Sequence, residues 1–238
     1  MNDLSLNIEN HSELASKLCP TVECDGLVVL LPTSKRGQGH FRMEVYSRNG
    51  TRQEERGNEV RGVAKYAKDA LIINENQILI ETDSGLQKTL VYGEGEISEV
   101  SLEIGSPSLQ SFNVSGKNSF NQTLAFDDIS FQATCCTIAR KTHVVVNVCE
   151  HDLPQIPLQQ WAPHFSEHPL VPQPSAIVFA TPNSTLDVSI RVWDDNQEID
   201  ISESSACAAV ISGTMNNWCE KEAVIHFAQG NLKVAWDE

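Results

Sequence analysis

The chain has 238 residues, a formal net charge of −15 and 40% hydrophobic residues, which is the composition of a globular protein that can bury a full core. Its 17 basic residues are scattered among 32 acidic ones, so we expect neither nucleic acid nor an anionic membrane surface as a partner. The first 18 residues are acidic and polar, where an export signal would be basic and then apolar. The expected compartment is therefore the cytoplasm.

The cysteines carry no signature of a metal site or of a disulfide framework. Their number is odd, and none of them forms a Cys-x-x-Cys pair or a Cys/His cluster at zinc spacing. We therefore expect free, mostly buried thiols, with no metal and no cofactor. On a strand, Cys135 and Cys136 would point to opposite faces, which argues against a joint site. The full set is Cys19, Cys24, Cys135, Cys136, Cys149, Cys207 and Cys219.

The first predicted elements are a strand over 26–31 and a strand-turn-helix unit over 41–69. Apolar residues alternate at the start of the unit, with the period of a half-buried strand, and Asn49-Gly50 supplies a tight turn. After a polar stretch, apolar or small residues recur at helical spacing over 60–67. Asn58 is the predicted N-cap of this helix.

The middle of the chain contains a predicted boundary and a Pro-rich segment. Ser, Asn, Gly and Pro concentrate over 106–121, which predicts one half over 1–113 and another over 114–238. The Pro-rich stretch over 151–174 predicts a short surface helix and loops. Further strand-like runs cover 77–83, 99–105, 142–148, 176–181, 223–228 and 232–236.

A second strand-turn-helix unit over 186–213 repeats the order of the first. Its strand alternates over 188–192, an Asp-Asn pair supplies the turn, and Ser204 or Ser205 is the predicted helix cap. The helix over 206–211 is small and apolar on every side, which predicts complete burial. The two units indicate an internal duplication. We therefore predict an α/β (α+β) fold of two pseudo-symmetric halves, each a mixed sheet wrapped around a central helix.

These motifs resemble the diaminopimelate epimerase family over nearly the whole chain. The first family motif is matched by Arg48-Asn49-Gly50-Thr51 and 56–64, and the second by Arg191-Val192-Trp193 and 198–209. Two shorter matches are Glu81-Thr82-Asp83-Ser84-Gly85 and His168-Pro169-Leu170. The resemblance implies a diaminopimelate-epimerase-like fold, a cofactor-independent isomerase, an amino-acid-like ligand in a cleft between the halves, and two catalytic cysteines beside helix N-termini.

The residues at the two catalytic positions differ from the family pattern. Arg56 stands where the first cysteine is expected and Ser202 where the second is expected. A guanidinium cannot act as a base, and a serine hydroxyl is a weak base unless another group activates it. We therefore exclude epimerisation by the two-cysteine mechanism. Ligand-binding positions have also changed, because Val29 and Asp195 replace polar and basic family residues.

The resemblance and the polarity of the two helix starts give the candidate site residues. As catalytic residues we predict Ser202, Glu59, Glu203 and His143, and as ligand-binding residues Arg56, Gly57, Asn58, Lys141, Glu198, Ser204 and Ser205. Each has a structural alternative. Glu59 and Glu203 can complement helix dipoles, His143 can be a structural histidine at a strand edge, and Lys141 can face solvent.

Two functions of different classes stay open. The first is a cysteine-independent isomerase-type enzyme that acts on an amino-acid-derived small molecule. The phenazine-biosynthesis isomerase branch implies this possibility, because it shares the fold, lacks the cysteine pair and moves protons with a carboxylate. The second is a noncatalytic binding or partner protein, a pseudoenzyme on the epimerase scaffold. Polar residues at the site favour the enzyme, and loss of the acid/base pair favours the binding protein. A homodimer is compatible with both.

Overall fold

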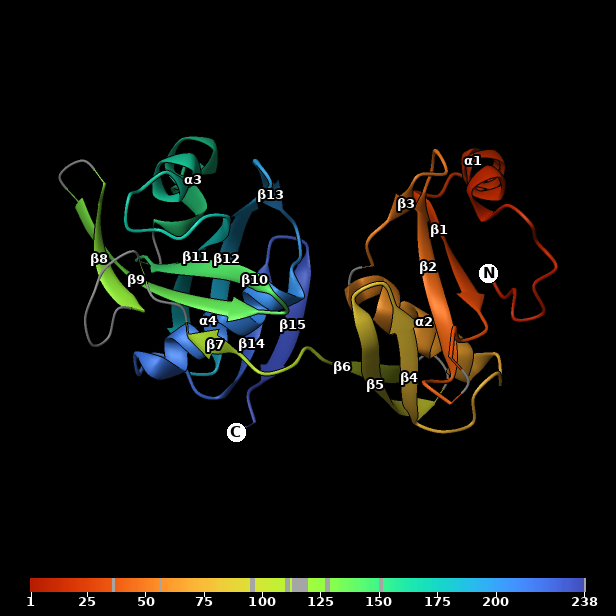
Figure 1. Cartoon of the computed structure of the whole chain (residues 1–238). Helices are drawn as coiled ribbons and strands as arrows, with labels where there is room; N and C mark the ends of the chain where they lie inside the picture. The colour runs from red at the N-terminus through yellow and green to blue at the C-terminus, as the bar shows by residue number, and fades with distance from the viewer. Residues whose placement is uncertain are drawn as a thin grey trace. The chain divides into compact units, whose positions relative to one another are not determined.

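The computed structural model describes residues 1–35, 37–55, 57–94, 97–109, 112, 120–126, 129–149 and 152–237. They form two compact units, Met1–Glu103 (unit 1) and Ile104–Glu238 (unit 2), which Figure 1 colours from red to yellow and from green to blue. The boundary expected between residues 113 and 114 lies outside the described residues. Each helix that the structure describes is too short or too polar to cross a membrane.

Unit 1 is a mixed sheet with a helix on each face. Its described strands follow the order β1-β2-β4-β5-β6, with β3 paired to β2. Only β2 and β4 run parallel, and the helix α2 connects them. The elements are α1 His11–Val22, β1 Gly26–Leu31, β2 Phe41–Ser47, β3 Arg52–Gln53, α2 Gly57–Asp69, β4 Gln77–Thr82, β5 Gly85–Glu94 and β6 Ile97–Glu103.

The alternation along β2 explains why both faces of this sheet are covered. Phe41, Met43 and Val45 point into the core under α2, together with the buried face of that helix. Tyr46 points to the other face, where α1 packs. The helix α2 begins at Gly57, so the prediction of Asn58 as its N-cap is wrong.

Unit 2 is a larger mixed sheet, also covered on both faces. Its described strands follow the order β15-β14-β12-β11-β10-β9-β7, with β13 beside β12 and β8 beside β9. The elements are β7 Ser108–Leu109, β8 Asn121–Phe126, β9 Ile129–Ile138, β10 Lys141–Asn147, the 3-10 helix η1 Leu153–Gln155, α3 Leu158–Ser166, β11 Ser175–Ser184, β12 Asp187–Asp194, β13 Gln197–Ile199, α4 Glu203–Met215, β14 Glu222–Phe227 and β15 Gly230–Ala235. The Pro-rich stretch thus holds the short helix that we predicted.

The helix α4 is buried nearly all round, as its small apolar residues predict. It packs on one face of the sheet, in a core that includes Cys136 and Val145, whereas α3 packs on the other face with Cys135 and Val144. The opposite orientation expected for Cys135 and Cys136 is confirmed. The N-cap of α4 is Ser202, so the prediction of Ser204 or Ser205 as the cap is wrong.

The internal duplication is visible as a shared connectivity. In unit 1 the chain runs from β2 through α2 to the parallel strand β4, and in unit 2 from β12 through α4 to the parallel strand β14. Each crossover is followed by an antiparallel partner, β5 or β15. The predicted fold class, two mixed-sheet halves that each contain a crossover helix, is confirmed. The helix α4 is buried over most of its surface, with Met215 exposed at its end, whereas α2 buries one face and leaves Tyr66 exposed on the other.

Candidate functional site

The polar start of α4 is built by three consecutive hydroxyl or carboxylate side chains and a cap. The backbone of Ser202 is extended, so the helix begins after it, and its Oγ accepts a hydrogen bond from the Ser205 amide at 3.3 Å. The Ser202 hydroxyl also donates to the Ser205 Oγ at 2.8 Å. Glu203 follows in the first turn, where a negative charge complements the helix dipole. Ser202 therefore already uses its proton within the cap, and a catalytic role for it stays a prediction.

His143 contacts this helix start from the sheet. It lies on β10 between β9 and β11, paired with Cys136 and Ala176, so the alternative of a histidine at a strand edge is wrong. Its side chain points to the α4 face and is completely buried. The His143 Nε2 lies 3.0 Å from the Ser204 Oγ. The fold thus joins two of the predicted site residues that are 61 positions apart in the chain.

The second ring nitrogen of His143 is unusual for a buried polar atom. The Nδ1 has no hydrogen-bond partner among the described residues. Burial lowers the pKa of His143 to about 4, and the charge of Lys141 acts in the same direction while the Lys141 backbone partly opposes it. The ring is therefore neutral near pH 7. His143 is thus a buried, neutral imidazole that contacts Ser204 through Nε2.

Lys141, at the start of β10, is paired within the protein. Its ammonium group forms a short ion pair with the Asp194 carboxylate at the end of β12, and the two side chains are 39% and 19% exposed. Lys141 is thus partly exposed, as the structural alternative expects, but it is also paired with Asp194. A ligand anion would have to compete with Asp194 for Lys141, and its predicted ligand-binding role stays a prediction.

Glu198 holds an arginine that ties a loop to the sheet. It forms a two-point ion pair with Arg191, with distances of 2.8 Å and 3.1 Å. The same guanidinium donates to the carbonyl oxygens of Leu153 and Ile156 around η1. This contact accounts for Glu198 without a ligand, and its predicted binding role is untested.

In unit 1, the predicted residues lie at the start of α2. Gly57, Asn58 and Glu59 form its first turn, and the Asn58 amide oxygen accepts a short hydrogen bond from Arg61. Arg56 lies outside the described residues, so its expected role in holding an anionic ligand group stays a prediction. Glu55, which the sequence did not single out, accepts the Ser84 amide at 2.9 Å and connects the segment before α2 to the β4–β5 turn.

Hydrogen bonding also sets the charge state of Glu55. Burial alone would raise the pKa of this carboxyl, but hydrogen bonds from Ser84 and Thr82 outweigh it and hold the pKa below its usual value. Glu55 is therefore an ionised anchor for the segment.

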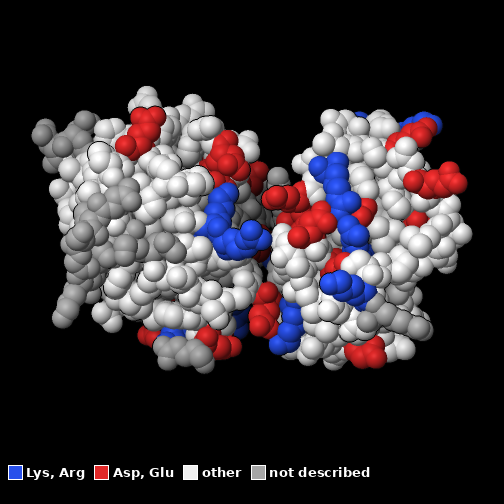
Figure 2. Space-filling view, in the orientation of Figure 1, with Lys and Arg blue, Asp and Glu red and all other residues white. Residues whose placement is uncertain are grey.

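A second polar cluster lies on unit 1, and its charges are mutually paired. Arg52 contacts Glu44 at 2.9 Å and Asp83 at 2.8 Å, and Arg42 contacts Glu44 at 3.0 Å. The Tyr46 hydroxyl donates to Glu44 at 2.6 Å, and burial together with this carboxylate raises the pKa of Tyr46 to about 12. Figure 2 shows a column of basic side chains on this unit, flanked by acidic ones. The cluster is an ion network that stabilises the fold.

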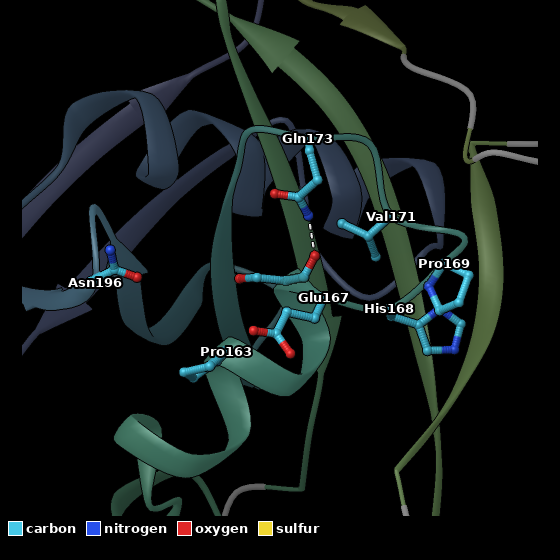
Figure 3. Close-up of a pocket in the computed structure, with 8 residues that line it drawn as sticks. Pro163, Glu167, His168, Pro169, Val171, Gln173 and Asn196 are labelled. Atoms are coloured by element: carbon cyan, nitrogen blue, oxygen red, sulfur yellow. Dashed lines mark hydrogen bonds between the residues drawn. The ribbon is translucent and has the colours of Figure 1, made fainter.

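One cavity of unit 2 lies apart from these residues. It is formed by the end of α3, the loop before β11 and the turn between β12 and β13 (Figure 3). It is lined by Pro163, Ser166, Glu167, His168, Pro169, Val171, Gln173 and Asn196. The Gln173 amide donates to the Ser166 carbonyl at its wall. None of the residues predicted as catalytic or ligand-binding lines this cavity.

The part of the chain that the structure describes contains no group of side chains arranged to bind a metal ion. No group of three or more His, Cys, Asp or Glu side chains is arranged there to hold an ion. Two thiols in the core around α4 are protonated near pH 7, because desolvation raises the pKa of Cys136 and of Cys207 to about 12. Acid/base chemistry at this place therefore depends on imidazole, hydroxyl and carboxylate groups.

Comparison with known proteins shows similarity to diaminopimelate epimerases along nearly the whole chain. No family model matches the chain. A diaminopimelate epimerase from Acetivibrio thermocellus is 28% identical over 100% of this chain and 86% of the relative. A diaminopimelate epimerase from Bacillus subtilis is 26% identical over 97% of this chain and 83% of the relative. The resemblance predicted from the two motifs is confirmed over the whole chain.

Solved structures with the same fold are more distant in sequence. A predicted epimerase from Pseudomonas aeruginosa superimposes with a TM-score of 0.60 at 12% identity, over 99% of this chain and 84% of the other. A PhzF-family phenazine biosynthesis protein from Bacillus anthracis gives 0.57 at 13% identity, over 97% and 81%. A hydroxyproline epimerase from Agrobacterium vitis, with bound trans-4-hydroxy-L-proline, gives 0.54 at 10% identity, over 88% and 70%.

Proposed function

We propose that this chain, a full-length relative of the diaminopimelate epimerases, is an isomerase-type enzyme that works without catalytic cysteines. Its ligand is an amino-acid-derived small molecule, and Ser204 and His143 carry a proton between them. The observation that carries the proposal is the buried contact of 3.0 Å between His143 Nε2 and Ser204 Oγ. The similarity to epimerases, some of which bind amino acids in their solved structures, supports the class of ligand.

The chemistry follows from the state of the two groups. A neutral imidazole can accept the Ser204 proton at Nε2, which leaves the serine oxygen able to take a proton from carbon. Return of the proton by the same route regenerates the starting ligand, so isomerisation needs a second group, such as Glu203, to deliver a proton to another face or another carbon of the ligand. A low pKa makes His143 a weak base, so the relay needs a ligand whose carbanion or enolate is stabilised nearby. Backbone N–H groups at the start of α4 can provide that stabilisation, because they carry the positive end of the helix dipole.

Glu203 is the second acid/base candidate of this unit. It lies directly before Ser204 in the first turn of α4, where a negative charge complements the helix dipole. An ionised carboxylate can remove a proton from carbon, while the Ser204 hydroxyl supplies one. Glu59 occupies the corresponding first turn of α2 and remains a candidate on the same reasoning.

A noncatalytic binding protein is the second candidate, and three contacts favour it. Ser202 is engaged in the cap, Lys141 is paired with Asp194, and Glu198 is paired with Arg191. Predicted site residues that are already satisfied by protein partners are typical of a site that has lost its reaction.

Solvent exchange distinguishes the two functions. The purified chain is incubated in deuterated water with a panel of amino acids and their derivatives, and α-deuteration is followed by mass spectrometry. We expect exchange into at least one member and only background exchange into diaminopimelate, since the two family cysteines are replaced. Ser204→Ala should lower the rate by at least about 100-fold, the usual contribution of a general acid or base.

The controls separate chemistry from folding. Ser130→Ala, at an exposed position of β9, should leave the rate unchanged, and both variants should keep the melting temperature of the parent. A panel member that raises the melting temperature but never exchanges its α-proton would support the binding protein and reject the enzyme.

A further inference from the structure

Two cysteines of unit 1 lie together where α1 ends. Cys19 is in the last turns of the helix, and Glu23 adopts the left-handed conformation (φ 56°) that ends it. The chain turns back so that the Cys24 amide donates to the Cys19 carbonyl at 3.1 Å. Cys19 is fully buried in the core under α1, and the Cys24 side chain packs against the same core.

The two thiols differ in their surroundings. Burial, followed by a hydrogen bond with the Cys24 side chain, raises the pKa of Cys19, whereas the charge of Arg48 lowers it. The Cys24 thiol donates to the Gly26 carbonyl at 3.3 Å and is partly exposed. The Cys24 thiol is therefore partly accessible to solvent, whereas the Cys19 thiol is buried in the core under α1.

We propose that Cys19 and Cys24 form an intrachain disulfide when the protein meets a hydroperoxide. Bridged cysteines need Cα atoms roughly 4.4–6.8 Å apart and side chains that face each other. The left-handed turn at Glu23 folds the chain back onto the end of α1, so that Cys24 is joined to Cys19 by a backbone hydrogen bond of 3.1 Å and packs against the same core. The two cysteines are separate from the start of α4, so this proposal does not depend on the proposed enzyme activity.

The reaction balances in two steps. The Cys24 sulfur attacks one peroxide oxygen, an S–O bond forms, the O–O bond breaks, and the thiol proton leaves with the other oxygen as water or alcohol. The Cys19 sulfur then attacks the Cys24 sulfur. The S–S bond forms, the S–O bond breaks, and the hydroxyl leaves as water with the Cys19 proton. Two thiols are oxidised by two electrons, and the peroxide is reduced.

The other cysteines provide internal comparisons. Cys135 and Cys136 are adjacent in sequence but belong to opposite faces of the sheet, and burial raises the pKa of each to about 12. Cys149 is exposed, so it reports whether the peroxide dose was sufficient. We expect Cys149 and the Cys19–Cys24 pair to react, and Cys135 and Cys136 to stay reduced.

Tryptic mapping tests the proposal directly, because cleavage after Lys17 and Lys35 places both cysteines in one peptide, 18–35. The folded chain is treated with hydrogen peroxide, denatured, alkylated and digested. We expect peptide 18–35 to lose two hydrogens and to take up no alkyl group. The reaction should be at least about tenfold faster in the folded chain than in urea, since the turn holds the two sulfurs together.

Single variants complete the test. In Cys24→Ser, Cys19 should stay reduced and alkylate fully, and in Cys19→Ser, Cys24 should accumulate as a sulfenic acid that dimedone traps. The proposal is overturned if peptide 18–35 of the parent keeps two alkylatable thiols at a dose that oxidises Cys149. It is also overturned if the linkage forms at the same rate in urea.

Discussion

At the scale of single residues, the neutral state of His143 is the property with the clearest consequence. Burial is the main cause that lowers its pKa to about 4, from the ordinary value near 6.5. The unfolded chain therefore binds a proton to this histidine as the pH falls through about 6.5, whereas the folded chain does so only near 4. Stability contributed by the neutral ring is fully present above pH 6.5 and is lost on acidification towards pH 4.

This difference in proton binding makes the free energy of unfolding depend on pH. We expect the free energy of unfolding to fall by roughly 3 kcal/mol between pH 6.5 and 4 on account of His143 alone. His143→Gln should remove that part of the slope, because glutamine does not titrate there. Urea unfolding of both proteins at several pH values measures the difference. Parallel curves for parent and variant over this interval would show that the ring is already charged or exposed in the folded chain.

The sequence named candidate site residues but did not predict their contacts. It identified Ser204 and His143 separately, yet their hydrogen bond depends on the packing of α4 against β10, which no local pattern encodes. It named Lys141 as a ligand-binding residue, with a solvent-facing lysine as the alternative, and did not predict the ion pair with Asp194, which lies two strands away in the sheet. A pairing across an intervening strand has no signal in sequence spacing.

At the scale of elements, we expect a glycine-to-alanine substitution to have opposite effects on the free energy of unfolding in the two crossover helices. A Cβ atom at Gly213, in α4, would lie 2.3 Å from the Cys219 Cβ and 2.7 Å from the Trp218 ring. A Cβ atom at Gly62, on the exposed face of α2, would meet nothing within 4 Å. Gly213 is therefore required by close packing, whereas Gly62 is not.

Alanine at each position tests this difference. Gly213→Ala should lower the free energy of unfolding by about 1–3 kcal/mol, because the turn after α4 has to move. Gly62→Ala should raise it by about 0.5–1 kcal/mol, because alanine favours the helix. Denaturant titration measures both values. A neutral or stabilising effect of Gly213→Ala would mean that α4 is less tightly enclosed than described.

Helix positions were predictable from the sequence, but caps were less so. The all-round apolar composition of the segment 206–211 correctly predicted the buried α4. Three serines, Ser202, Ser204 and Ser205, are all good caps, and propensity alone could not select the one whose backbone is extended. In the same way, Asn58 was a good cap by type but lies one residue inside α2.

At the scale of the whole molecule, the duplicated unit was the most informative feature of the sequence. Alternating strand, turn and helix recur in both halves because each half needs the same parallel crossover to cover its sheet. The sequence predicted no strand at β5, β7, β8 or β9, and these strands and their pairings came only from the structure. Periodicity thus predicted the architecture, and tertiary packing determined the contacts at its polar site.

If Ser204 and His143 act as one proton-transfer unit, a double-mutant cycle of solvent exchange distinguishes that unit from two independent residues. Deuterium incorporation into the best panel ligand is measured for the parent, Ser204→Ala, His143→Gln and the double variant. Residues that act as a unit are strongly non-additive. We therefore predict that the double variant exchanges as slowly as either single variant and no more slowly. If the rate losses of the two single variants multiply in the double variant, Ser204 and His143 do not act as one unit. The same conclusion holds if the single variants keep the parental exchange rate.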